Sequence, residues 1–219
     1  MLNVRPKKQQ RRNGGQSMLE AIVASGIIVT AVGAALTLVQ SSINGAKFSE
    51  EQIVAYNLAR EGMEVVRQIR DSNWLAGRDY DEGIVGPNYE LAAVPLFDPT
   101  TNVWSLSYTG ADWESNPSRV YRQVAPDGNV PVGLFRQWTT QPDSTEVTRF
   151  RRLVSLRKLC SDVGGSTANR IAYTSSAVSQ PCPVGTDNVG VEVSSHVHWQ
   201  RAGGSTSQVE LVERLFDWR

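Results

Sequence analysis

The chain has 219 residues and equal numbers of basic and acidic side chains, 22 of each. Five of the basic residues lie in the first fifteen positions, which contain no acid: Arg5, Lys7, Lys8, Arg11 and Arg12. The remaining 17 basic residues stand against 22 acidic ones, so the rest of the chain is net negative. This distribution argues against a protein that coats nucleic acid, and the length allows one ordinary domain beside an anchoring segment.

An apolar run of nineteen residues, Ala21–Val39, follows the basic stretch and contains no charge and no proline. A helix needs about 20 apolar residues to cross the hydrocarbon core of a bilayer. Because basic residues stay on the cytoplasmic side, we expect a transmembrane helix over about residues 19–39, with everything after Gln40 outside. The run continues into a second helical segment, unlike a removable secretory signal, so we expect the membrane helix to be retained.

Glu20 stands at the entrance of this apolar run, five residues after Gly15. A carboxylate in a membrane helix is costly, which makes it a functional candidate. The alternative is a glutamate that rests at the interface and is favoured there by the dipole of the helix N-terminus. Position alone does not decide between the two.

The basic start, the glycine and the stretch QSMLEAIVASGIIV resemble the processing signature of type IV prepilins and type II secretion pseudopilins. The resemblance implies that a prepilin peptidase removes residues 1–15 by cutting between Gly15 and Gln16. It further implies that Gln16 is N-methylated and that Glu20 docks the subunit onto its neighbour. The family's usual first residue is phenylalanine or methionine, whereas this chain has glutamine. The new ammonium of Gln16 and the Glu20 carboxylate would attract each other by about 4 kcal/mol at about 4 Å.

The resemblance also implies a fold, partners and a location. The fold is α+β and type IV pilin-like: a long N-terminal helix, half in membrane or filament core and half amphipathic, packed on a C-terminal antiparallel β-sheet head. The implied partners are other pilin subunits in a homo- or hetero-oligomeric filament, the prepilin peptidase, a pilus assembly platform and the membrane. The subunit would start in the cytoplasmic membrane, head outside, and end in an extracellular pilus or pseudopilus.

The amphipathic half of the helix is visible in the residues themselves. No proline occurs between Gln40 and Asp71, and apolar or small residues recur at the 4-4-3-4 spacing of one helical face, at Val54, Leu58, Gly62, Val65 and Ile69. We therefore expect one helix from Ser17 to about Asp71, in a segment 16–73, that stops near Ser72–Gly77. Ser42, Asn44 and Gly45 mark the expected place of a bend between its two halves. Two separate helices joined by a short loop are the alternative.

Residues 74–219 are expected to form the β-rich head, because turn-forming Gly, Pro, Asn and Asp recur at short intervals. The clearest strand is Val189–Trp199, in which apolar residues alternate with polar ones, including Glu192, His196 and His198. Gln208–Val212 would return as its hairpin partner. Further strands are expected at Tyr89–Val94, Val103–Tyr108 and Val147–Leu159, and Leu215, Phe216 and Trp218 add apolar mass at the end.

Only two cysteines occur, Cys160 and Cys182. A disulfide between them would close a loop of about twenty residues and stabilise the head by roughly 3 kcal/mol. Two buried free thiols are the alternative, but the expected export favours the disulfide.

A run of basic residues, Arg149–Lys158, is the most concentrated positive stretch of the head. Arg149, Arg151, Arg152 and Arg157 would suit a DNA backbone or a host surface, as in a membrane-anchored binding module. We favour the alternative of an edge strand, or of the outer face of a strand, whose charges meet water or acidic surfaces of neighbouring subunits.

The two histidines, His196 and His198, share one strand face and would need a third ligand to hold a metal, with Glu192 the nearest candidate. Two surface histidines explain the pattern better. The sequence contains no motif of a known catalytic or phosphate-binding type, so we predict no enzyme activity, no metal and no cofactor. The six tryptophans are better explained by core and subunit contacts than by a glycan platform, although adhesion to a glycan stays open.

Overall fold

A computed structural model describes residues 14–84, 92–126, 130–162, 171–177, 182, 184–201 and 204–217. The chain divides into two compact units, residues 1–49 and residues 50–219. Most of the predicted basic leader and the predicted apolar contribution of Trp218 lie outside the described residues.

Helix α1, Gly14–Leu75, is unbroken and extends beyond the predicted Ser17–Asp71 at both ends. The prediction of a single helix is therefore confirmed, and two helices joined by a loop are excluded. Its last turn is closed by a backbone bond from Ala76 N to Ser72 O at 3.1 Å. Gly77 follows with a φ of 70°, a left-handed conformation that glycine adopts without strain, and this ends the helix where the sequence predicted.

The part of α1 that belongs to the head unit buries one face. Its buried residues are Ala55, Leu58, Ala59, Gly62, Met63, Val65, Val66, Arg70 and Asn73. Leu58, Gly62 and Val65 of the predicted face are confirmed as buried, whereas Val54 and Ile69 are half-buried at its border. The exposed flank carries an ion pair of Glu64 and Arg67, whose Oε2 and Nη1 atoms lie 2.6 Å apart.

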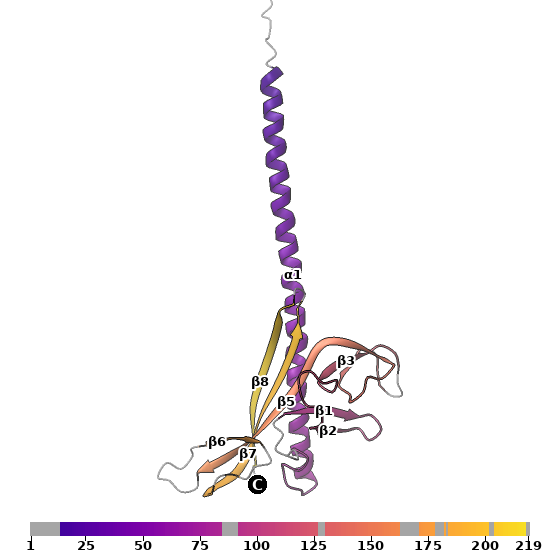
Figure 1. Cartoon of the computed structure of the whole chain (residues 1–219), viewed down its shortest axis with the longest axis vertical. Helices are drawn as coiled ribbons and strands as arrows, with labels where there is room; N and C mark the ends of the chain where they lie inside the picture. The colour runs from indigo at the N-terminus through magenta and orange to yellow at the C-terminus, as the bar shows by residue number, and fades with distance from the viewer. Residues whose placement is uncertain are drawn as a thin grey trace, which may run out of the picture. The chain divides into compact units, whose positions relative to one another are not determined.

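An antiparallel sheet of eight strands lies against this face (Figure 1). The strands are β1 (Ala92–Asp98), β2 (Val103–Ser107), β3 (Arg119–Gln123), β4 (Phe135–Arg136), β5 (Thr145–Asp162), β6 (Ile171–Ala177), β7 (Thr186–Gln200) and β8 (Thr206–Phe216). The long strand β5 pairs with β1, β3, β6 and β7, while β8 pairs with β7. The layout is α+β, with a long N-terminal apolar helix packed on an antiparallel sheet, as predicted.

The strand predictions have mixed outcomes. The strands at Val103–Tyr108, Val147–Leu159, Val189–Trp199 and Gln208–Val212 are confirmed as β2, β5, β7 and β8. The prediction of Tyr89–Val94 is wrong in its C-terminal limit, because β1 continues through Pro95 to Asp98. Strand β1 pairs with β5 only at Ala92 and Ala93, and Pro95 lies beyond that pairing and faces β2 alone. The proline, which has no N–H, therefore interrupts no hydrogen bonding between β1 and β5. Residues 89–91 lie outside the described residues.

The core lies between α1 and the sheet. Its central cluster contains Met63 and Val66 from α1, Val154 and Leu156 from β5, Val191 and Val193 from β7, and Leu215 from β8, together with Tyr80, Ile84, Ala93 and Tyr108. Cys160, at the end of β5, forms the predicted disulfide with Cys182, with their Cα atoms 5.7 Å apart. The alternative of two free thiols is thereby excluded.

Candidate functional site

The first unit presents an apolar helical surface that its own chain does not cover. Every residue from Ser17 to Lys47 is exposed. Its large apolar side chains are exposed by between 45% at Ile43 and 72% at Met18 and Leu38. Among the described helices, α1 is long and apolar enough to cross a membrane. An apolar surface of this extent requires a partner other than water.

The hydroxyl groups within this apolar run are bonded inside the helix. Ser25 donates to the carbonyl of Ile22 at 2.9 Å, Thr30 to that of Ile27 at 2.9 Å, and Thr37 to that of Ala34 at 2.7 Å. These three are all the hydroxyls between residues 21 and 39. Since unsatisfied polar groups are costly in hydrocarbon, this arrangement fits an apolar surrounding.

Small side chains form a seam along the same stretch. Gly26, Thr30, Gly33 and Thr37 follow one another at spacings of four, three and four residues, which keeps them on one helical face. A Cβ at Gly26 or at Gly33 would meet nothing within 4 Å. The packing of this chain therefore does not require glycine there, whereas close approach of another helix would.

The predicted processing residues lie at the start of α1. Gly15 and Gln16 have helical backbone, and the side chain of Gln16 lies outside the described residues. Glu20 is helical and exposed, four residues further on. Residues four apart share one face of a helix, which places the positions of Gln16 and Glu20 on the same side.

The four arginines proposed as a contact surface on β5 differ in their surroundings. Arg152 is fully buried. Its guanidinium lies 3.1 Å from Glu61 Oε2 and donates to the carbonyl of Leu58 at 3.0 Å and to Gln137 Oε1 at 2.7 Å. Burial lowers the pKa of Arg152, and the charge of Glu61 opposes that shift. The prediction of a DNA or surface contact is wrong for Arg152, because the core encloses it.

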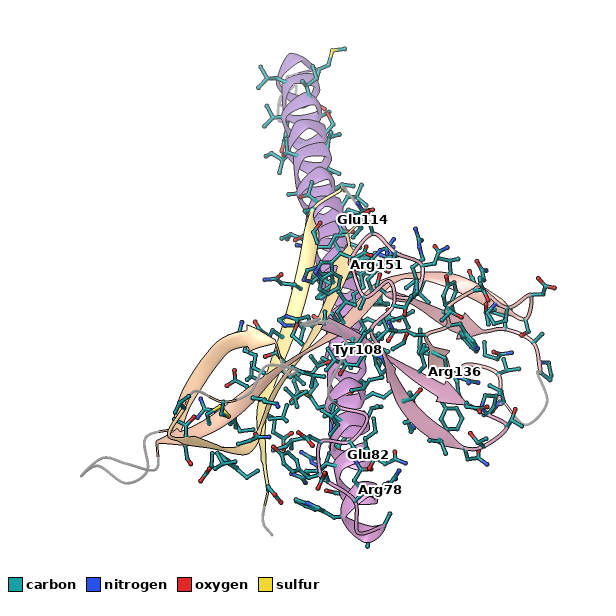
Figure 2. The ribbon with its side chains drawn as sticks, turned by 60° about the horizontal axis from the view of Figure 1, so that its bottom comes forward. Arg78, Glu82, Tyr108, Glu114, Arg136 and Arg151 are labelled. Carbon is teal, nitrogen blue, oxygen red and sulfur yellow. A yellow bond between two sulfur atoms is a disulfide. The ribbon has the colours of Figure 1, made fainter. Side chains whose placement is uncertain are left out.

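Two further arginines of the run also bind their own chain. Arg149 pairs with Glu51 of α1. Arg151 donates to the Ser115 carbonyl at 2.8 Å and to Ser118 Oγ at 2.9 Å, beneath the loop that carries Glu114 (Figure 2). Burial is the main cause that lowers the pKa of Arg151, and the positive charge of Arg119 is the second. Arg157 is exposed. The interpretation of β5 as an edge strand is wrong, since β5 pairs with four other strands. The other option, an outer strand face whose charges meet water, agrees with Arg157 and with Arg149, whose side chain is 50% exposed.

The histidines occupy the polar face of β7. His198 stacks on Trp113, with ring centroids 3.6 Å apart and an angle of 9° between the rings. His196 Nε2 lies 3.8 Å from Glu210 Oε1. Burial lowers the pKa of both imidazoles. Among the described residues, no group of three or more His, Cys, Asp or Glu side chains is placed to hold a metal ion.

Sequence reasoning missed the residues that fasten α1 to the sheet. Glu51 accepts a hydrogen bond from Trp199 Nε1 at 3.1 Å in addition to its pair with Arg149, and Glu61 reaches Arg152. Both acids border the buried face of the helix, and this position was the one sequence feature that could have indicated their contact with the sheet. Their partners lie on strands far away in the sequence, so the pairing itself could not be anticipated.

In the comparisons with known proteins, no family model, no curated protein and no solved structure matches this chain.

Proposed function

We propose that this chain is a type IV pilin-like subunit, a minor pilin or pseudopilin, that assembles into an extracellular filament through the N-terminal half of α1. The observation that carries the proposal is the apolar stretch of α1, which is exposed along its whole length and continues as a helix that packs on a sheet. A membrane accommodates such a surface before assembly, and helices of other subunits accommodate it afterwards.

Three features of the stretch support this role. The hydroxyls of Ser25, Thr30 and Thr37 are bonded within the helix, so the surface is apolar all round. Gly26 and Gly33 leave room for a neighbouring backbone. Glu20 lies one helical turn beyond Gln16, where it would neutralise the ammonium that cleavage after Gly15 creates.

The proposed sequence of events begins in the cytoplasmic membrane, with the head outside. A prepilin peptidase cuts between Gly15 and Gln16, Gln16 is methylated, and an assembly platform adds the subunit to a filament of other pilin subunits. The alternative, an anchored receptor for DNA or for a host or surface ligand, is less favoured, because Arg152 is buried and Arg149 and Arg151 bind groups of their own chain.

Two measurements test the proposal in cells that make the peptidase. Mass spectrometry of the mature N-terminus should give a chain that begins at Gln16, and an intact leader or another start contradicts processing. Glu20→Ala should reach the membrane but be lost from sheared filaments. The matched control is Glu50→Ala, which removes an exposed carboxylate from the same helix and should assemble normally. Equal incorporation of the two variants contradicts a docking role for Glu20.

A further inference from the structure

Strand β8 is a long free edge of the sheet. It has 11 residues, and among the described strands it pairs with β7 alone (Figure 1). The register runs from Gly190↔Phe216 to Gln200↔Thr206 without a shift. An edge strand about twice the usual length of roughly 5–6 residues, without a proline or a bulge, is a template for pairing with another chain.

The hairpin's backbone bonds show which residues of β8 turn their N–H and C=O groups toward the open edge. Arg201 N donates to Ser205 O at 2.9 Å at the turn, and Asp217 N donates to Val189 O at 2.9 Å at the other end. Bonded and non-bonded pairs alternate along an antiparallel ladder. The odd-numbered residues of β8 therefore bond to β7, and the even-numbered residues present their backbone groups outward.

The side chains of these even-numbered residues form a pattern that complements itself. Glu210 and Arg214 lie two positions to either side of Val212, and all three are exposed. When two copies of β8 pair antiparallel with Val212 opposite Val212, each Glu210 lies opposite Arg214 of the second copy. A two-fold axis at residue 210 or at residue 214 would instead oppose like charges, and an axis at 211 or 213 would form neither ion pair.

Contacts already present within one chain extend this pattern across the sheet. Arg214 Nε lies 3.3 Å from Glu192 Oε2 of β7, and His196 lies 3.8 Å from Glu210. Pairing through Val212 would therefore create rows in which Glu192, Arg214 and Glu210 of the second copy alternate in charge, with His196 of the second copy next to its Glu210. Such rows favour one register over its neighbours.

We propose that the free edge of β8 is a docking site for the β8 strand of a second copy of this chain, paired antiparallel about Val212. The part of α1 that packs on the sheet does not obstruct this pairing. Gly62 approaches Ser195 of β7 and Val154 of β5, so this part of α1 lies over those two strands. At a strand spacing of about 4.8 Å, the two helices would lie about 19 Å apart, beyond the roughly 8–10 Å of helices in contact.

The pairing is distinct from filament assembly. A two-fold axis reverses the direction of the second head, whereas all subunits of one polar filament point the same way. The β8 contact therefore joins heads that belong to separate filaments or to facing surfaces. It does not depend on the proposed function, and Glu20→Ala should leave it unchanged.

Cross-linking of the full chain in detergent tests the register. In Val212→Cys the two new thiols face each other across a bonded pair, where Cα atoms lie about 5.5 Å apart, within the range of a disulfide. A covalent dimer is expected on a non-reducing gel. Gln208→Cys is the matched control on the same exposed face, with its two copies about 27 Å apart. Equal cross-linking of both variants, or of neither, overturns the proposal.

A charge exchange tests the chemistry. Sedimentation of the full chain in detergent should show that Glu210→Arg and Arg214→Glu each raise the dimer Kd at least about tenfold, because each variant opposes like charges twice. An equimolar mixture of the two variants should dimerise again, since every opposed pair is then of opposite sign. A mixture that dimerises no better than the single variants overturns the proposal. A dimer Kd that is unchanged in both variants overturns it as well. Melting temperatures confirm that each variant is folded.

Discussion

At Gly62, helix α1 lies close against the sheet. A Cβ at this position would lie 2.5 Å from Ser195 Oγ and 3.3 Å from Val154 Cγ2. Ser195 is fully buried, and its hydroxyl has no hydrogen-bond partner among the described residues. Glycine is thus required here by the distance between helix and strand, although it is the poorer helix former.

Gly62→Ala should lower the free energy of unfolding by about 1–3 kcal/mol, because overpacking outweighs the gain in helix propensity. Gly62→Ala combined with Ser195→Ala should recover most of the loss, because the closest clashing atom is then gone. Denaturant unfolding of both single variants and the double variant completes the cycle. Strict additivity of the two effects would contradict the contact.

The two histidines make the stability of the head depend on pH. Burial lowers the pKa of His196; the charge of Glu210 opposes this shift and that of Arg157 adds to it. Burial also lowers the pKa of His198; His196 adds to this shift and a side-chain hydrogen bond with Gln208 opposes it. The unfolded chain therefore binds more protons than the folded one below about pH 6.5, so stability is complete above that pH and falls as the pH drops through it.

Melting temperatures measured between about pH 7.5 and pH 5.5 should fall as the pH decreases. The double variant His196→Gln/His198→Gln should show a shallower fall than the wild-type chain, because its carboxylates are unchanged and only the imidazoles are gone. Parallel curves for the two proteins would show that the histidines are not the source of the dependence.

At the scale of elements, α1 and β5 are joined by an ion pair whose cation is buried in the core. Arg152 of β5 is fully buried and reaches Glu61 of α1, whose side chain remains 34% exposed. The guanidinium also bonds to the Leu58 carbonyl and to Gln137. Such a network opposes sliding of the helix along the strand, because a shift by one position would leave the buried cation without its acid.

Glu61→Gln should therefore cost about 3 kcal/mol of unfolding free energy, since it removes the anion that faces a buried cation. Glu64→Gln is the matched control: it lies on the same helix, its partner Arg67 is exposed by 33%, and its loss should cost less than about 1 kcal/mol. Denaturant titration measures both. Equal costs would mean that burial of Arg152 adds nothing to the pair.

Local pattern explains which elements the sequence revealed. The helix around Leu58 and Val65 and the alternation along Val189–Trp199 are periodic, so both were predicted within a few residues of their ends. Strand β3 was missed because its apolar residues Val120 and Tyr121 are adjacent and do not alternate with polar ones. Strand β4 has only two residues, and β6, Ile171–Ala177, consists mostly of small and polar residues. The burial of Arg152 depends on Glu61, which lies on another element, and so no local pattern could signal it.

At the scale of the whole molecule, the two units differ in whether their large apolar side chains are exposed or buried. In residues 50–219 the large apolar side chains mostly enter a core, whereas those from Met18 to Ile43 are exposed. The first unit is thus suited to an apolar surrounding and the second to water, and one continuous helix passes from the first to the second.

Val29→Lys should reduce membrane integration, because a lysine at the centre of a spanning helix costs about 2.5–3.5 kcal/mol. Val29 is 70% exposed in the middle of the apolar run. The fraction of chain that resists alkaline extraction from membranes measures the effect. Val132→Lys, at a site 55% exposed in the head, is the control and should extract like the wild-type chain. Equal extraction of both variants would contradict a spanning role for the run.

The absence of neighbours around Gly26 and Gly33 has a consequence for how this chain is studied. When an isolated molecule is denatured, a substitution changes the free energy of unfolding only through the contacts that it alters within that molecule. Along Met18–Ile43 such contacts are few, so even drastic replacements would pass a folding screen unnoticed. Substitutions in this stretch affect contacts with lipid or with other subunits, so their effects are measurable only in assays that supply a bilayer or other subunits.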